Sequence, residues 1–115
     1  MSKIKCETLY EAIQYTFNKP SGLYNIQTDQ GIIEAGRGAF GLSYSNYVIY
    51  NITIKHHLRG KHIWSNLLRK LAENNDIDTI VVFAVSSHKM DQIMSKLKIN
   101  NIGFVNYGGD FVWKR

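Results

Sequence analysis

The chain has 115 residues, of which 44% are hydrophobic and 20% are charged. This length suits one core, so we expect residues 1–115 to form a single domain. No apolar run approaches the roughly 20 residues that span a bilayer, and the first residues lack the apolar stretch of a signal peptide. The sequence therefore favours a soluble cytoplasmic protein without a membrane span.

The charge and the cysteine content narrow the possible partners and exclude some kinds of site. Fourteen Lys and Arg residues against nine Asp and Glu residues give a net charge of +5, which favours partners that carry negative charge, such as phosphate-bearing small molecules, nucleic acid or acidic proteins. Cys6 is the single cysteine. It excludes a disulfide within the chain and any zinc site that needs several cysteines.

The first half of the chain predicts one helix and three strands. Thr8 and Glu11 have the spacing of a capping box, which predicts a helix over 8–17. Two apolar runs on either side of a turn-forming segment predict a hairpin over 23–33, whose second strand should end in the glycine-rich stretch 36–41. The run 47–54 is β-branched and aromatic on both faces, which predicts a central strand.

The second half begins with apolar residues at helical spacing, which predict a helix over 61–74. The apolar run 79–85 then predicts a buried strand, parallel to the central one because a helix crosses between them. A further helix, capped by Ser86 or Ser87, should run to about residue 100. A last hairpin, with strands in 102–107 and 111–113, completes the order.

These elements predict the fold class. We expect an α/β domain with a mixed, mostly antiparallel sheet of about six to seven strands. A parallel βαβ unit should lie at its centre, with about three helices in all.

The segment between the central strand and the next helix is rich in positive charge. Arg59, Gly60 and Lys61 stand where the strand gives way to a helix start. A helix start offers free N–H groups and the positive end of the dipole, and glycine lets the backbone approach a ligand closely. The segment predicts an anion site, although a basic turn of this kind, taken alone, is more often a solvated loop.

The element order around this turn resembles the GNAT N-acetyltransferase superfamily, with 52–104 matching the family's core. The resemblance implies a GNAT-like fold and acetyl-CoA as cosubstrate. It also implies that turn amides hold the pyrophosphate and that the two flanking strands splay to admit the pantetheine arm. The implied cofactor-binding residues are Ile54, Lys55, His57, Leu58, Arg59, Gly60, Lys61, His62 and Ser87.

The sequence departs from the family pattern at two kinds of position. His62 stands where the family has glycine or alanine, so its side chain points away, contacts phosphate or blocks the CoA pocket. The family's tyrosine acid, placed four residues before a Gly-Phe pair, corresponds to Ile99, and the central strand has no carboxylate. Candidate catalytic residues are therefore His56 as a base, or Tyr50 and Asn51 holding a water.

The resemblance implies an acetyl-CoA-dependent N-acyltransferase acting on an amine acceptor, which could be a protein or a nucleic acid. The alternative is a GNAT-fold binding protein that has lost the transfer reaction and holds nucleic acid or an acidic protein. The acceptor, the acyl group and the oligomeric state have no signal in the sequence.

Two further groups invite other functions. Arg37 lies in a glycine-rich segment beside Phe40 and Tyr44, so it belongs either to a flexible loop that grips a base or to a bent edge strand as an exposed arginine. A faint similarity of this segment to phage Mom-type DNA-modification proteins keeps nucleic acid as a candidate partner. The neighbours His56 and His57 point to opposite faces of an extended segment with no acidic residue nearby, so we expect no metal site.

Overall fold

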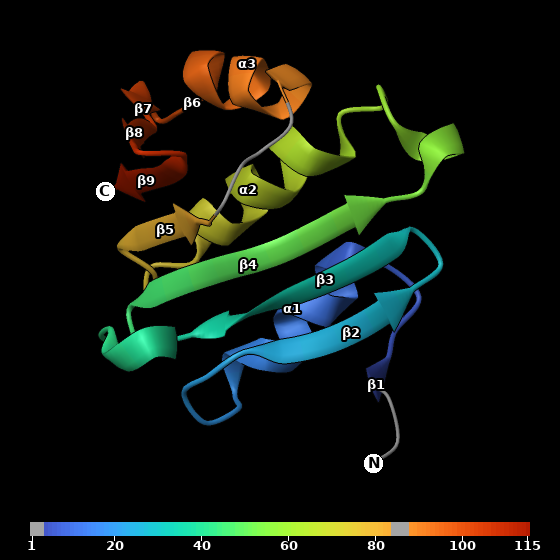
Figure 1. The fold of residues 1–115 in the computed structure, drawn as a ribbon. Coiled ribbons are helices and arrows are strands. Elements are labelled where there is room, and N and C mark those ends of the chain that lie inside the picture. Colours follow the sequence, from blue (N-terminus) through green and yellow to red (C-terminus); the bar gives the residue numbers. More distant parts are fainter. Residues whose placement is uncertain (1–3, 84–87) are drawn as a thin grey trace.

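The computed structural model describes residues 4–83 and 88–115, and its main feature is a seven-stranded sheet in the order β1-β2-β3-β4-β5-β9-β8 (Figure 1). The β1–β2 and β4–β5 pairs are parallel and the other pairs are antiparallel. The mixed, mostly antiparallel sheet with a central parallel unit is confirmed. The strands are β1 (Ile4–Lys5), β2 (Tyr24–Thr28), β3 (Gly31–Arg37), β4 (Asn46–Ile54), β5 (Thr79–Val82), β8 (Val105–Tyr107) and β9 (Asp110–Lys114).

Three α-helices lie within the described residues: α1 (Leu9–Phe17), α2 (Ile63–Glu73) and α3 (His88–Lys96). The predicted cap of α1 is confirmed, since the Thr8 hydroxyl accepts a hydrogen bond from the Glu11 backbone N–H at 3.1 Å. None of these helices is long and apolar enough to cross a membrane.

Both α1 and α2 cover the same face of the sheet, and Figure 1 shows them behind it. The reason is that β2 and β4 run in the same direction, so the right-handed crossovers β1–α1–β2 and β4–α2–β5 fall on one side. The main core fills the space between these helices and the sheet, and Met94 and Leu97 from the α3 region join it. We call the opposite side, which bears Glu34 and Val48, the open face.

The central strand β4 changes character halfway along. Within the residues that the structure describes, its last pair with β5 is Ile49 and Val82, and the Phe83 N–H donates to the Ile49 carbonyl at 2.9 Å. On the other side, the register with β3 shifts between Glu34 and Ala35, so that Tyr50 is an extra residue in β4. Burial on both faces stops at Ile49, whereas Ile52 and Ile54 are half-buried and pack against the core. The predicted central strand over 47–54 is confirmed.

One prediction for the C-terminal third is wrong in detail. Helix α3 ends at Lys96 rather than near residue 100, because Asn100 and Asn101 have φ values of 53° and 64° and form a two-residue turn. This turn joins the short strands β6 (Lys98–Ile99) and β7 (Ile102–Gly103), which pair with each other outside the main sheet. The predicted strand end at 84–85 lies outside the described residues.

Candidate functional site

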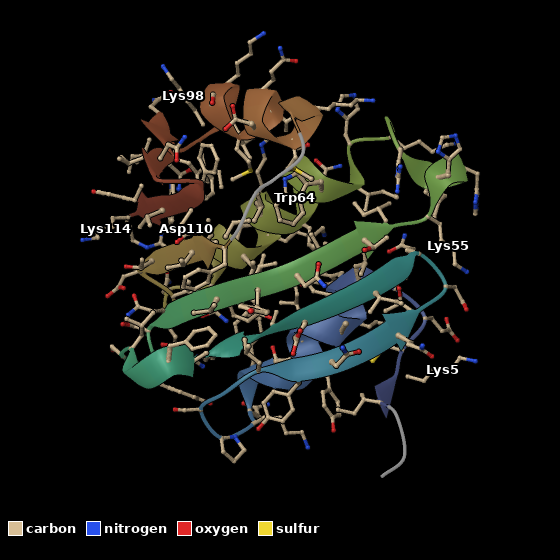
Figure 2. The ribbon with its side chains drawn as sticks, viewed as in Figure 1. Lys5, Lys55, Trp64, Lys98, Asp110 and Lys114 are labelled. Carbon is tan, nitrogen blue, oxygen red and sulfur yellow. The ribbon has the colours of Figure 1, made fainter. Side chains whose placement is uncertain are left out.

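A pocket of about 530 Å³ lies where β4 ends and where α2 and α3 begin. Figure 2 places Trp64 in this region, between β4 and α3. The lining is largely apolar, with the side chains of Ile52, Ile54 and Trp64 among it, whereas Arg59 and Lys89 bring positive charge. Such a space suits a long apolar chain that ends in an anion.

The turn between β4 and α2 is held in place by hydrogen bonds from its own backbone and from the Arg59 side chain. The Leu58 N–H donates to the Lys55 carbonyl at 2.9 Å, and the Arg59 Nε donates to the Ile54 carbonyl at 3.0 Å. Gly60 has a φ of +82° and open space around its Cα. Backbone conformation rather than crowding therefore favours glycine there.

The start of α2 presents free donors beside the pocket. The first bond of the helix runs from the Asn66 N–H to the His62 carbonyl at 3.0 Å. The N–H groups of the three residues before Asn66 thus have no partner one turn back in the helix, and they lie at the positive end of its dipole. This end of the helix can attract an anion bound at the pocket mouth.

His62 caps α2 in a left-handed conformation, with φ 60° and ψ 19°, and its side chain forms no capping hydrogen bond. This conformation suits glycine best and is uncommon for residues with a Cβ, although histidine is among those that adopt it. The residue lines the pocket. The backbone at this position therefore prefers glycine, one of the two residues that the resemblance implies there.

The left-handed backbone of His62 leads to a stability prediction. His62→Gly should raise the free energy of unfolding by about 0.5 to 1 kcal/mol, because glycine relieves the cost of a Cβ in this region. Urea denaturation measures the change. His57→Gly is the control, since His57 lies in a right-handed turn and its replacement should not stabilise the protein. A destabilised His62→Gly variant would contradict the argument.

The structure brings most of the predicted cofactor-binding residues together. Five of them line the pocket: Ile54, Leu58, Arg59, Gly60 and His62. Lys55, His57 and Lys61 are exposed and lie beside the pocket without lining it, and Figure 2 shows Lys55 just beyond the end of β4. Ser87 lies outside the described residues, and its role stays a prediction.

The predicted catalytic residues do not form one group. Tyr50 and Asn51 are the bulged residues of β4, and both are exposed. A bulge of this kind puts both side chains on the same side of a sheet, here the open face. His56 lies past the end of β4 in a short 3₁₀ turn, is exposed and does not line the pocket. The two alternatives, His56 as a base or a water held by Tyr50 and Asn51, thus lie at different places, and both stay predictions.

Sequence reasoning missed residues on two other elements. Lys89, Met90 and Ile93 of α3 line the pocket, and no sequence motif marks them as ligand contacts. Glu34 on β3 pairs with Asn51 across the bulge. No motif marks Glu34, and only the strand register reveals a carboxylate beside the bulged residues.

Arg37 is neither a mobile loop residue nor an exposed one, and both predictions for it are wrong. Only 9% of it is exposed. Its Nε donates to the Tyr44 carbonyl at 2.9 Å, its Nη1 donates to the Phe17 carbonyl at 3.2 Å, and its guanidinium lies 3.8 Å from the centre of the Tyr44 ring. Arg37 thus ties the end of β3 to α1 and is not available to a ligand.

Other reactive side chains are not arranged for chemistry. Burial, together with the nearby Glu11 carboxylate, raises the pKa of the Cys6 thiol, so the thiol is not activated as a nucleophile. Burial also raises the pKa of the Tyr47 phenol, whose oxygen lies 2.9 Å from the Thr16 hydroxyl. Over the part of the chain that the structure describes, no three His, Cys, Asp or Glu side chains gather as metal ligands.

Comparison with solved structures identifies a similar fold. The crystal structure of an acetyltransferase from Thermus thermophilus matches 77% of this chain with a TM-score of 0.52 and 15% sequence identity. The fold is GNAT-like. The chain spans 57% of the length of that acetyltransferase. No family model matches the sequence, and no curated protein matches it. At this level of identity the GNAT-like fold is shown, and the activity is a separate question.

Proposed function

We propose that the protein is an N-acyltransferase that uses an acyl-CoA, acetyl-CoA in the first place, and transfers the acyl group to an amine. The observation that carries the proposal is the pocket at the end of β4. It combines an apolar lining with Arg59, Lys89 and a helix start at its mouth. The apolar lining suits a pantetheine arm, and the positive charges with the helix start suit a pyrophosphate.

The C-terminal half of β4 supports the same proposal. Beyond Ile49 it stays paired with β3 as far as Ile54, and it lines the pocket with Ile52, Thr53 and Ile54. Backbone N–H groups of this half that are not bonded to β3 are donors that could stabilise negative charge on a thioester oxygen. In the transfer, a C–N bond forms as the C–S bond breaks, the amine loses a proton, and CoA leaves as a thiol.

Calorimetric titration with CoA and acetyl-CoA tests the proposal without knowledge of the acceptor. We expect micromolar dissociation constants, and Arg59→Ala should weaken binding about fivefold because it removes one charged contact, worth about 1 kcal/mol. Arg69→Ala is the matched control, since Arg69 is exposed on α2 and does not line the pocket. Absence of heat at millimolar ligand would overturn the proposal.

A second function, binding of a polyanion without transfer, is favoured by the distribution of charge. Residues 35–72 contain six Lys and Arg residues and no Asp or Glu. The exposed members near the pocket are Lys55, Arg59 and Lys61. Titration with duplex and single-stranded DNA and with an acidic peptide at two salt concentrations tests this function. Salt-sensitive binding of one of them, with no binding of CoA, would establish it in place of the transferase.

A further inference from the structure

Three aromatic rings gather on the open face beside Ile49 and Val82, the last described pair of β4 and β5. The ring centres of Phe40, Tyr50 and Phe83 lie 5.4 to 6.2 Å apart. They come from the turn after β3, the bulge of β4 and the end of β5, so only the folded chain brings them together. Phe40 is 61% exposed and Tyr50 is 46% exposed. We call these residues the aromatic trio.

The backbone of Phe40 is strained. Its φ of 58° and ψ of 33° are left-handed, which costs a residue with a Cβ about 1 to 2 kcal/mol. A bulky side chain is rare in this conformation. Because most of the Phe40 ring is exposed, its hydrophobic burial offsets little of this strain energy. Strain of this kind is typical of positions that contact a ligand.

A carboxylate stands next to the aromatic trio. Glu34 is paired with Asn25 of β2 on one side and with Asn51 of β4 on the other, and directly paired residues share a face with Cβ atoms about 5 Å apart. Asn51 directly follows Tyr50. Across the ranges 4–83 and 88–115, no group forms a hydrogen bond or an ion pair with the Glu34 carboxylate. The carboxylate is therefore open to a ligand.

Glu34 also decides the charge of this area. By alternation from Ile26, Ile33 and Ile49, which face the core, the open-face positions of β2 to β5 hold neutral side chains except at Glu34. The positively charged residues of 35–72 do not occupy these positions. The open face near the bulge thus favours a cation and disfavours a polyanion such as nucleic acid.

We propose that Glu34 and the aromatic trio form the acceptor site, and that the acceptor is a protonated primary amine on an aromatic or apolar carrier. The ammonium group pairs with the Glu34 carboxylate and lies against the electron-rich ring faces, while the carrier packs on the exposed rings. This inference rests on the proposed function. It assigns the acceptor to the face of β4 opposite the core, next to the bulge at Tyr50 and Asn51.

An NMR titration with phenethylammonium chloride tests this site directly, with 2-phenylethanol as a neutral probe that has the same carrier. We expect the amine to shift the resonances of Phe40 and Tyr50 and to bind at least about fivefold more tightly than the alcohol, a preference of about 1 kcal/mol. Glu34→Gln should remove the preference. Glu73→Gln, a change of an exposed carboxylate on α2, should leave it intact.

Phe40→Gly separates a binding role from a structural one. It removes the ring and relieves the strained backbone, so the amine should no longer bind, while the melting temperature stays the same or rises. Equal binding of the two probes, an unchanged preference in Glu34→Gln, or shifts confined to other residues would overturn the inference. CoA binding without amine binding refutes this site alone, whereas amine binding without CoA binding supports the site and refutes the proposed function.

Discussion

Arg37→Ala is expected to lower the free energy of unfolding by about 3 kcal/mol, because it removes two charge-assisted hydrogen bonds of a buried side chain and leaves a part-buried carbonyl without its donor. The Tyr44 carbonyl loses the Nε donor, and the ring of Tyr44 loses the guanidinium that lies against it. The Phe17 carbonyl keeps the Tyr44 hydroxyl as a donor at 2.9 Å. Urea denaturation monitored by circular dichroism measures the loss.

Arg37→Lys distinguishes geometry from charge. Lysine keeps the charge, but its ammonium has no planar group to lie on the Tyr44 ring while donating sideways to a carbonyl. It should therefore recover less than half of the lost stability. If Arg37→Ala costs under about 0.5 kcal/mol, a value typical of surface substitutions, the buried role of Arg37 is refuted.

Ile93→Trp is expected to weaken CoA binding about 30-fold, or about 2 kcal/mol, by filling part of the pocket with a larger ring. Ile93 lines the pocket from α3 and is 40% exposed, so the fold should tolerate the change. Calorimetry gives the affinity, and thermal melting checks that the protein is still folded.

Tyr107→Trp provides the control for this experiment. Tyr107 is 62% exposed on β8 at the edge of the sheet and does not line the pocket. Its replacement adds a similar ring and should leave CoA affinity unchanged. If Ile93→Trp binds CoA as tightly as the parent protein does, the ligand occupies a different place and the proposed function loses its main support.

The central βαβ unit could be predicted from sequence because its signals are local. Leu67, Leu68 and Leu71 recur at helical spacing and are all buried, and the apolar run that begins at Thr79 forms β5. Each pattern lies within one element and needs no knowledge of distant residues. For the same reason the turn that contains Gly60 could be placed between strand and helix before its geometry was known.

The remaining features depend on tertiary contacts. Arg37 is buried because α1 supplies the Phe17 carbonyl and a later turn supplies Tyr44. Glu34 meets Asn51 because of the bulge, and no sequence pattern gives that register. The end of α3 differs from its prediction because Asn100 and Asn101 suit both a helix end and a two-residue hairpin turn, and the pairing of β6 with β7 decides between them.

The bulge in β4 makes one residue of the sheet dispensable to the core. Ile49 and Ile52 both face the helices, although an unbroken alternation would put them on opposite sides. Loss of the single codon for Tyr50 would restore regular alternation and leave every inward side chain where it is. In evolution, the bulge that places Tyr50 on the open face can thus arise or vanish by one in-frame insertion or deletion, while the hydrophobic core is inherited unchanged.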